Sequence, residues 1–143
     1  MSRMIFINLP VADLKASTAF YEAAGATRNA TFSDETAACM VFSETIFVML
    51  LTHEKFASFT SRPIGDRSTV HALLCLSCDS RADVETQLAA AVRAGGRPDP
   101  TPVQDHGFMY GRSFEDLDGH IWEIMWMDPA VAGADGGMNA DAA

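Results

Sequence analysis

The pattern of hydrophobic and polar residues predicts a strand and then an amphipathic helix at the start of the chain. Residues 4–9 are apolar except for Asn8 and have the length of a buried strand. Asp13 offers a side-chain oxygen for a helix N-cap, apolar residues then recur at helical spacing, and Gly25 suits the C-terminal end. We therefore expect one strand followed by a helix of about three turns.

Three more strands are predicted before a polar connection. They cover residues 27–32, 37–43 and 46–52, and the turn signals Ser-Asp-Glu and Glu-Thr separate them. Residues 53–60 suit a short helix, and residues 61–68 have the proline, glycine and charge content of a linker. The first half thus has the element order βαβββ.

The second half repeats this order. A strand is predicted at 70–78, a helix runs from an N-cap at Ser80 to Gly95, and strands follow at 97–104, 108–114 and 121–127. Because the N-caps Asp13 and Ser80 lie 67 positions apart and the glycines Gly25 and Gly95 lie 70 apart, we infer an internal duplication. We expect one α+β domain over residues 1–129, with modules at about 1–60 and 69–129, and a disordered tail at 130–143.

Composition narrows the classes of partner. A net charge of −9 with scattered basic residues argues against binding to nucleic acid or to an anionic membrane surface. No apolar stretch approaches the length of a membrane span, and polar residues interrupt the N-terminal run before a signal peptide could form. We expect a cytoplasmic protein.

The three cysteines are expected to be reduced thiols. Cys75 and Cys78 have CxxC spacing, but they lie in a predicted strand, where residues three apart point to opposite faces. Their two sulfurs therefore cannot share a metal ion.

Two segments resemble the signatures of the vicinal-oxygen-chelate superfamily, which includes glyoxalases, bleomycin resistance proteins and extradiol dioxygenases. NLPVADLKASTAFYEAAGA resembles its opening strand and helix, through Val11, Asp13, Ser17, Phe20, Tyr21 and Gly25. GFMYGRSFEDLDGHIWEIMWM resembles its closing hairpin, through Phe114, Asp116, Asp118, Gly119, His120 and Glu123. The resemblance covers about residues 4–129. It implies two βαβββ modules that form half-barrels around a cavity, commonly in a homodimer.

The resemblance also implies a divalent metal, but the sequence departs from the ligand pattern. The usual first-strand histidine positions fall at Phe6 and Leu73, and the first module's counterpart of Glu123 falls near Val48. Glu123 alone keeps a ligand-type side chain at these positions. Since a stable site needs three or four ligands, we expect no tightly bound metal, and the cofactor, if any, stays unknown.

Glu123 and His71 are the candidate catalytic residues. Glu123 lies in an apolar strand, and His71 has the parity of Leu73, so both are expected on the cavity face. Each also has a structural alternative, as a satisfied strand carboxylate and as a strand-edge histidine. The predicted cavity-lining residues are Phe6, Asn8, Val48, Leu73, Tyr110 and Met125.

Two functions fit these features. The first is a small-molecule enzyme of the glyoxalase or dioxygenase type, such as a lactoylglutathione-lyase-like protein, with Glu123 as metal ligand or base. The second is a metal-free binding protein of the resistance type, without catalysis. The missing ligands favour the second hypothesis, and the retained Glu123 supports the first.

Overall fold

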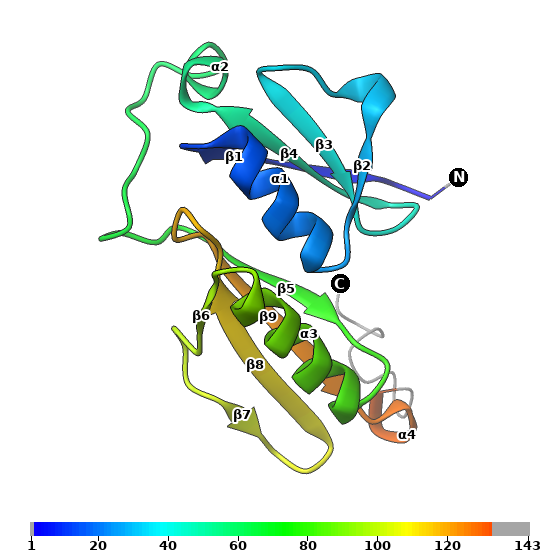
Figure 1. The fold of residues 1–143 in the computed structure, drawn as a ribbon. Helices are drawn as coiled ribbons and strands as arrows, with labels where there is room; N and C mark the ends of the chain where they lie inside the picture. The colour runs from blue at the N-terminus through cyan, green and yellow to red at the C-terminus, as the bar shows by residue number, and fades with distance from the viewer. Residues whose placement is uncertain (1, 133–143) are drawn as a thin grey trace.

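The computed structural model describes residues 2–132 and contains two sheets, each covered by one long helix (Figure 1). The first half consists of β1 (Ile5–Val11), α1 (Leu14–Ala23), β2 (Thr27–Asn29), the 3₁₀ helix η1 (Ala30–Phe32), β3 (Ala37–Val41), β4 (Ile46–Thr52) and α2 (His53–Ala57). The second half consists of β5 (Leu73–Ser77), α3 (Arg81–Arg93), β6 (Arg97–Pro98), β7 (Gln104–Asp105), β8 (Met109–Glu115), β9 (Ile121–Met127) and α4 (Pro129–Ala132).

The two sheets have equivalent strand orders. The first runs β1-β4-β3-β2 and the second β5-β9-β8-β6, with β7 added on β8. In each half the first strand is parallel to the last, and the other pairs are antiparallel. The predicted α+β fold of two βαβββ halves is confirmed. Neither sheet closes into a barrel, so β1 and β5 remain edge strands.

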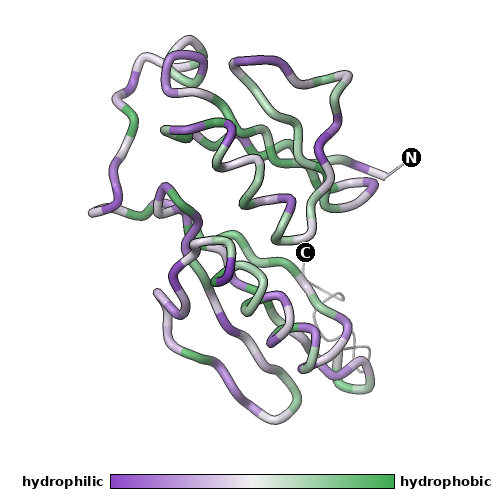
Figure 2. The backbone as a smooth tube through the Cα atoms, viewed as in Figure 1, coloured by the Kyte–Doolittle hydropathy of each residue, from purple (hydrophilic) through white to green (hydrophobic). Residues whose placement is uncertain are grey.

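The helix ends follow the predicted capping residues. The Asp13 side chain accepts a hydrogen bond from the Ala16 amide, and the Ser80 side chain accepts one from the Asp83 amide. Gly25 and Gly95 have φ angles of 107° and 109°, a left-handed backbone that favours glycine after a helix. Along both helices hydrophilic and hydrophobic positions alternate (Figure 2), as expected for helices that cover a sheet on one side.

The strands predicted at 37–43 and 70–78 are shorter in the structure, at Ala37–Val41 and Leu73–Ser77, and two further predicted strands are broken by other structure. The first, at 27–32, ends after Asn29, whose side chain caps η1 by accepting a hydrogen bond from the Thr31 amide. The second, at 97–104, is interrupted between β6 and β7. Proline at positions 98, 100 and 102 removes ladder donors, and Asp99 adopts a φ of 52°, so a continuous strand cannot form there.

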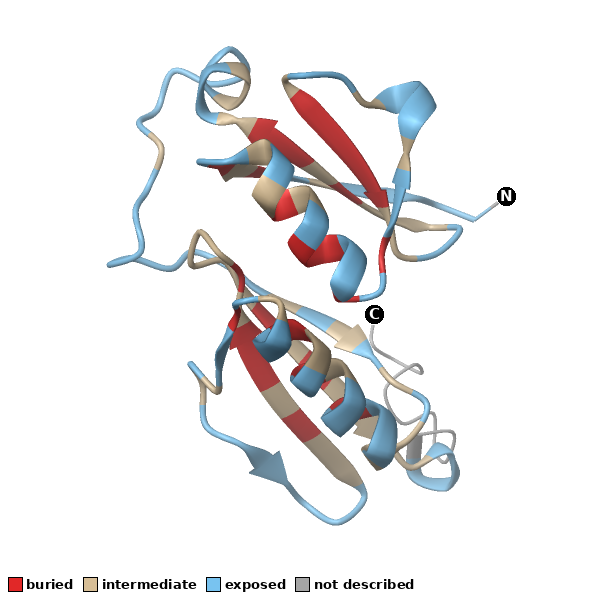
Figure 3. Ribbon diagram, in the orientation of Figure 1, coloured by how far each residue is buried: buried red, intermediate tan, exposed pale blue. Residues whose placement is uncertain are grey.

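One hydrophobic core joins both halves. Buried residues gather where each helix meets its sheet and where α1 meets the second half (Figure 3). The first half contributes Leu9, Val11, Phe20, Tyr21, Ala26, Ala38, Met40, Val48 and Leu50 to this core, and the second contributes Val84, Leu88, Ala91, Phe114, Trp122 and Ile124. The two halves therefore share one hydrophobic core.

The C-terminal region is described only in part. Residues 130–132 end the short helix α4, and the rest of the predicted tail, residues 133–143, lies outside the described residues. Within residues 2–132, no helix is both long enough and apolar enough to span a membrane.

Candidate functional site

The turn between β8 and β9 connects the second half to the first. The Asp118 carboxylate accepts hydrogen bonds from the Ala12 amide at 2.9 Å and from the Ser17 hydroxyl at 3.2 Å. The His120 Nε2 lies 2.8 Å from the Pro10 carbonyl, and since a carbonyl oxygen only accepts, Nε2 carries the proton. The turn thus attaches to the end of β1 and the start of α1.

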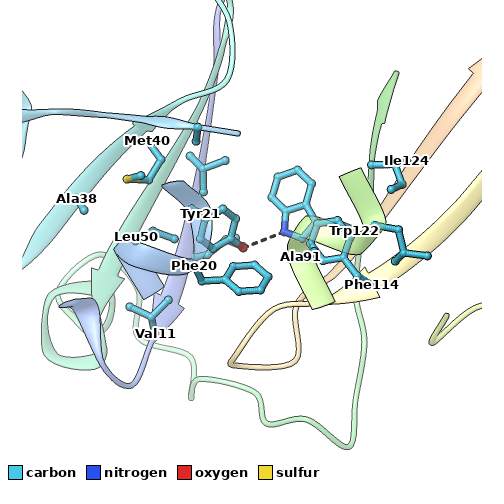
Figure 4. Close-up of a cluster of buried hydrophobic side chains, with 14 of the residues drawn as sticks. Val11, Phe20, Tyr21, Ala38, Met40, Leu50, Ala91, Phe114, Trp122 and Ile124 are labelled. Atoms are coloured by element: carbon cyan, nitrogen blue, oxygen red, sulfur yellow. Dashed lines mark hydrogen bonds between the residues drawn. The ribbon is translucent and has the colours of Figure 1, made fainter. Parts of the chain in front are cut away.

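A buried chain of hydrogen bonds strengthens the same junction. The Trp122 indole N–H donates to the Tyr21 hydroxyl at 2.9 Å (Figure 4). That hydroxyl donates to the Asp116 carboxylate at 2.6 Å. Asp116 also accepts the amides of Asp118 and His120, which shapes the turn. Burial raises the pKa of Asp116, against the lowering effects of His120 and of these hydrogen bonds.

Beside this junction lies a pocket of about 450 Å³. It is bounded by the end of β1, the β8–β9 turn, the start of β5, the α2 residue Phe56, and the linker that runs from α2 to β5 along one side of both halves (Figure 1). Its apolar walls include Leu9, Ile64 and Ile121. A concave, mainly apolar space at the junction of the two halves has the character of a small-molecule site.

A few polar side chains enter this pocket. Asn8, Arg62 and His71 line it, and within the described residues none of these side chains hydrogen-bonds to protein. Asp118 and His120 also line it, but the Asp118 carboxylate oxygens and the His120 Nε2 already bond to the first half. Asn8, Arg62 and His71 are thus available to orient a ligand.

The structure places Glu123 outside this pocket. Glu123 pairs in register with Cys75 on one side and Ser113 on the other, on the sheet face that α3 does not cover. We call this the open face of the second sheet. Desolvation and the nearby Glu123 carboxylate raise the pKa of the Cys75 thiol, so that thiol stays protonated at neutral pH.

The two candidate catalytic residues do not converge. His71 precedes β5 by two residues, whereas Cys75 marks the level of Glu123 on that strand. His71 and Ala72 precede the strand, so His71 lies beyond the end of β5. His71 therefore belongs to the pocket and Glu123 to the open face.

The cavity-lining predictions divide into three groups. Asn8 lines the pocket, as just described. Phe6, Leu73 and Met125 lie on the open faces, where Phe6 is 50% exposed and stacks on Phe47 at 4.6 Å between ring centroids. The remaining two residues, Val48 and Tyr110, lie outside the pocket.

Val48 and Tyr110 both point to the helix side of their sheets. Val48 pairs with Ile7 and is fully buried in the core, so its neighbour Met49, paired with Asn8, occupies the open face instead. The offset of 75 positions between Val48 and Glu123 was one residue longer than that between Met49 and Glu123, and one residue reverses the face on a strand. Tyr110 donates a hydrogen bond to Glu85 of α3, and the Arg81 guanidinium stacks over its ring.

The residues present do not fit the family's metal centre. Phe6, Met49 and Leu73 stand at or near three of its ligand positions and offer no hard or borderline donor beside Glu123. Among residues 2–132, no group of three or more His, Cys, Asp or Glu side chains is arranged to hold a metal ion.

Comparison with known proteins agrees with this architecture. The model of the Glyoxalase/Bleomycin resistance protein/Dioxygenase superfamily matches residues 3–124. The chain belongs to this superfamily. No curated protein sequence matches it.

Solved structures share the superfamily fold at low sequence identity. A hypothetical protein from S. aureus has a TM-score of 0.74 and 24% identity, with 88% of this chain and 94% of that chain covered. A family enzyme from Burkholderia phytofirmans has a TM-score of 0.72 and 18% identity over 88% and 99% of the chains. A fosfomycin resistance protein from Listeria monocytogenes has a TM-score of 0.62 and 19% identity over 88% and 91%.

The residues of the superfamily signatures make mainly structural contacts in this protein. Asp118 and His120 were recognised in the sequence only as parts of a motif, yet both border the pocket and hold the two halves together. Residues 61–68 were interpreted as a connection and residues 70–72 as the start of a strand, although both segments contribute to the pocket wall. Pro63 and Ile64 were the available signal, because a purely solvated linker seldom needs such residues.

Proposed function

We propose that this superfamily member binds a small, largely apolar molecule with at least one hydrogen-bonding group, in the pocket between its halves and without a bound metal. The pocket is the observation that supports this proposal. Its volume of about 450 Å³ lies within the usual range for small-molecule sites.

The lining chemistry supports this class of ligand. Leu9, Phe56 and Ile121 offer apolar surface for the body of the molecule. The Asn8 amide both donates and accepts hydrogen bonds, and the His71 ring offers a nitrogen of either kind. The Listeria neighbour is named as a resistance protein, and recognition of a small toxic molecule is a role that such a pocket could serve.

A lyase or dioxygenase activity is the second candidate function, and Glu123 is the observation that favours it. Within the described residues its carboxylate makes no hydrogen bond or ion pair, and it lies on an open sheet face beside Cys75. That function requires a divalent metal that this chain's own residues do not surround, so we derive no catalytic step from it.

We also propose that the chain forms a homodimer. Both edge strands carry exposed apolar residues: Ile5 is 53% exposed and Leu73 is 49% exposed. Unpaired edges with apolar side chains favour association, and a second copy would cover them.

The binding proposal is tested with N-phenyl-1-naphthylamine, an uncharged dye that fluoresces in apolar sites. We expect saturable binding, and we expect Ala72→Trp, which places a large ring in the pocket, to weaken it by at least about tenfold. The matched control is Cys75→Trp, which adds the same ring on the open face of the second sheet and leaves the affinity unchanged.

Two outcomes would contradict the proposal. Weaker binding in Cys75→Trp with normal binding in Ala72→Trp would move the site to the open face. Loss of binding on treatment with EDTA, reproduced by Glu123→Gln, would show that a metal is required and would favour the second candidate function.

A further inference from the structure

The linker, residues 60–72, supplies most of one side of the pocket. Ten of the nineteen lining residues belong to it. It contains no helix or strand, so no hydrogen-bonded ladder fixes its shape. Its internal hydrogen bonds are local, such as those from Ser68 and Thr69 to Asp66. Its position must therefore depend on contacts with the rest of the molecule.

Arg67 makes the polar contacts that attach this linker. Its Nη1 donates to the Leu117 carbonyl at 2.7 Å, and its Nη2 donates to the Glu115 carboxylate at 3.3 Å. Among the described residues, the other side-chain hydrogen bonds of positions 60–70 stay within the linker. The Glu115 side chain is only 13% exposed, so a mostly buried carboxylate anchors the guanidinium.

Gly119 provides the space for this attachment. A Cβ atom built at position 119 would lie 2.9 Å from Cγ and 3.3 Å from Cβ of Arg67. The stem of Arg67 therefore lies directly across the β8–β9 turn. Gly119 also has a φ of 92°, which side chains rarely adopt, so two constraints require glycine here.

We propose that Arg67 is a positioning residue that holds the linker as a wall of the pocket and thereby sets ligand affinity from outside the pocket. Arg67 itself is absent from the pocket lining, whereas residues on both sides of it in sequence, Asp66 and Thr69, are present. The effect on ligand rests on the proposed binding function. The effect on the linker does not.

The linker is tested first, without ligand, by backbone ¹⁵N order parameters. In the unmodified protein we expect residues 64–70 to approach the rigid value of about 0.85, and in Arg67→Ala to fall below about 0.6. Arg97→Ala is the matched control, because Arg97 also pairs with Glu115, at 3.6 Å, but lies in β6 and holds no linker residue. Unchanged order parameters in Arg67→Ala would overturn the proposal.

A second variant disturbs the contact between Arg67 and the β8–β9 turn through a change in the turn itself. Gly119→Ala inserts a methyl group against the Arg67 stem, and we expect it to mobilise the linker as well. The positive φ at position 119 adds strain to any variant with a side chain there, and Gly119→Ser gives a strain comparable to that of Gly119→Ala. We expect both Gly119 variants to mobilise residues 64–70 more than Arg97→Ala does. A rigid linker in both variants would count against the proposed attachment.

The ligand effect is then measured with N-phenyl-1-naphthylamine, whose lack of charge removes any direct attraction to an arginine. We expect Arg67→Ala to weaken binding by about tenfold, Arg67→Lys by less, and Arg97→Ala not at all. If the linker becomes mobile but the dye still binds normally, Arg67 does not set affinity. If Ala72→Trp fails to affect the dye, the pocket function fails while the linker result stands.

Discussion

At the scale of single residues, Asp116 has the most constrained environment. Asp116 is 2% exposed, and its carboxylate accepts hydrogen bonds from the Tyr21 hydroxyl and from two backbone amides. Three donors favour the charged form, but burial outweighs them and raises the pKa of Asp116 above its ordinary value of 3.8. The folded state therefore holds the Asp116 proton more tightly than the unfolded state does.

This pKa shift predicts how stability depends on pH. The favourable contribution of Asp116 is complete below pH 3.8 and declines as pH rises through its raised folded-state pKa. We expect the free energy of unfolding of the unmodified protein, relative to Asp116→Asn, to decrease as pH rises above 3.8. Urea denaturation at a series of pH values above 3.8 measures the difference.

Asp99 gives a control of opposite sign. The guanidinium of Arg112 donates to both Asp99 oxygens, at 2.9 Å and 2.6 Å, and lowers the pKa of that carboxyl. The advantage of the unmodified protein over Asp99→Asn should therefore be complete above pH 3.8, stay constant while the Asp116 difference decreases, and be lost only as pH falls through the lowered pKa of Asp99. A difference between unmodified protein and Asp116→Asn that does not change with pH would disprove the assignment for Asp116.

At the scale of elements, the β8–β9 turn and the start of α1 form one joint. Asp118 accepts hydrogen bonds from Ala12 and Ser17, and its negative charge lies near a helix N-terminus, where it is favoured. We expect Asp118→Ala to lower the free energy of unfolding by about 2 kcal/mol. A double-mutant cycle with Ser17→Ala should show a coupling of about 1 kcal/mol. Additive effects would mean that the two side chains do not interact.

At the scale of the whole molecule, the exposed sheet edges predict a dimer. Phe6 on β1 and Leu73 on β5 are each about half exposed, although both are large and apolar. We expect light scattering at micromolar concentration to give twice the chain mass of 15.4 kDa. Phe6→Lys should shift the mass towards that of the monomer, because a charge on the edge opposes association. Val92→Lys is the control, since Val92 is exposed on the α3 surface, away from both edges. A monomeric unmodified protein would refute the proposal.

The sequence alone determined the features that depend on neighbours along the chain. The caps at Asp13 and Ser80, the glycines at 25 and 95, and the repeated order βαβββ follow from local propensity and periodicity, and the structure agrees with them. The interruption between β6 and β7 was also visible in principle, since the prolines at 98, 100 and 102 are printed in the sequence. The superfamily signatures likewise placed Asp118 and His120 in a turn before a strand.

Only the tertiary structure decided what those residues contact. A strand register is set by pairing with distant strands, so the displacement of Val48 to the core and of Met49 to the open face could not be read from spacing alone. The same holds for His71 and Glu123, which share a parity but lie at different levels of the sheet, one in the pocket and one outside it. The pocket wall depends on Arg67 crossing Gly119, two residues 52 positions apart in sequence. Such a contact arises from packing between halves, and no local pattern encodes it.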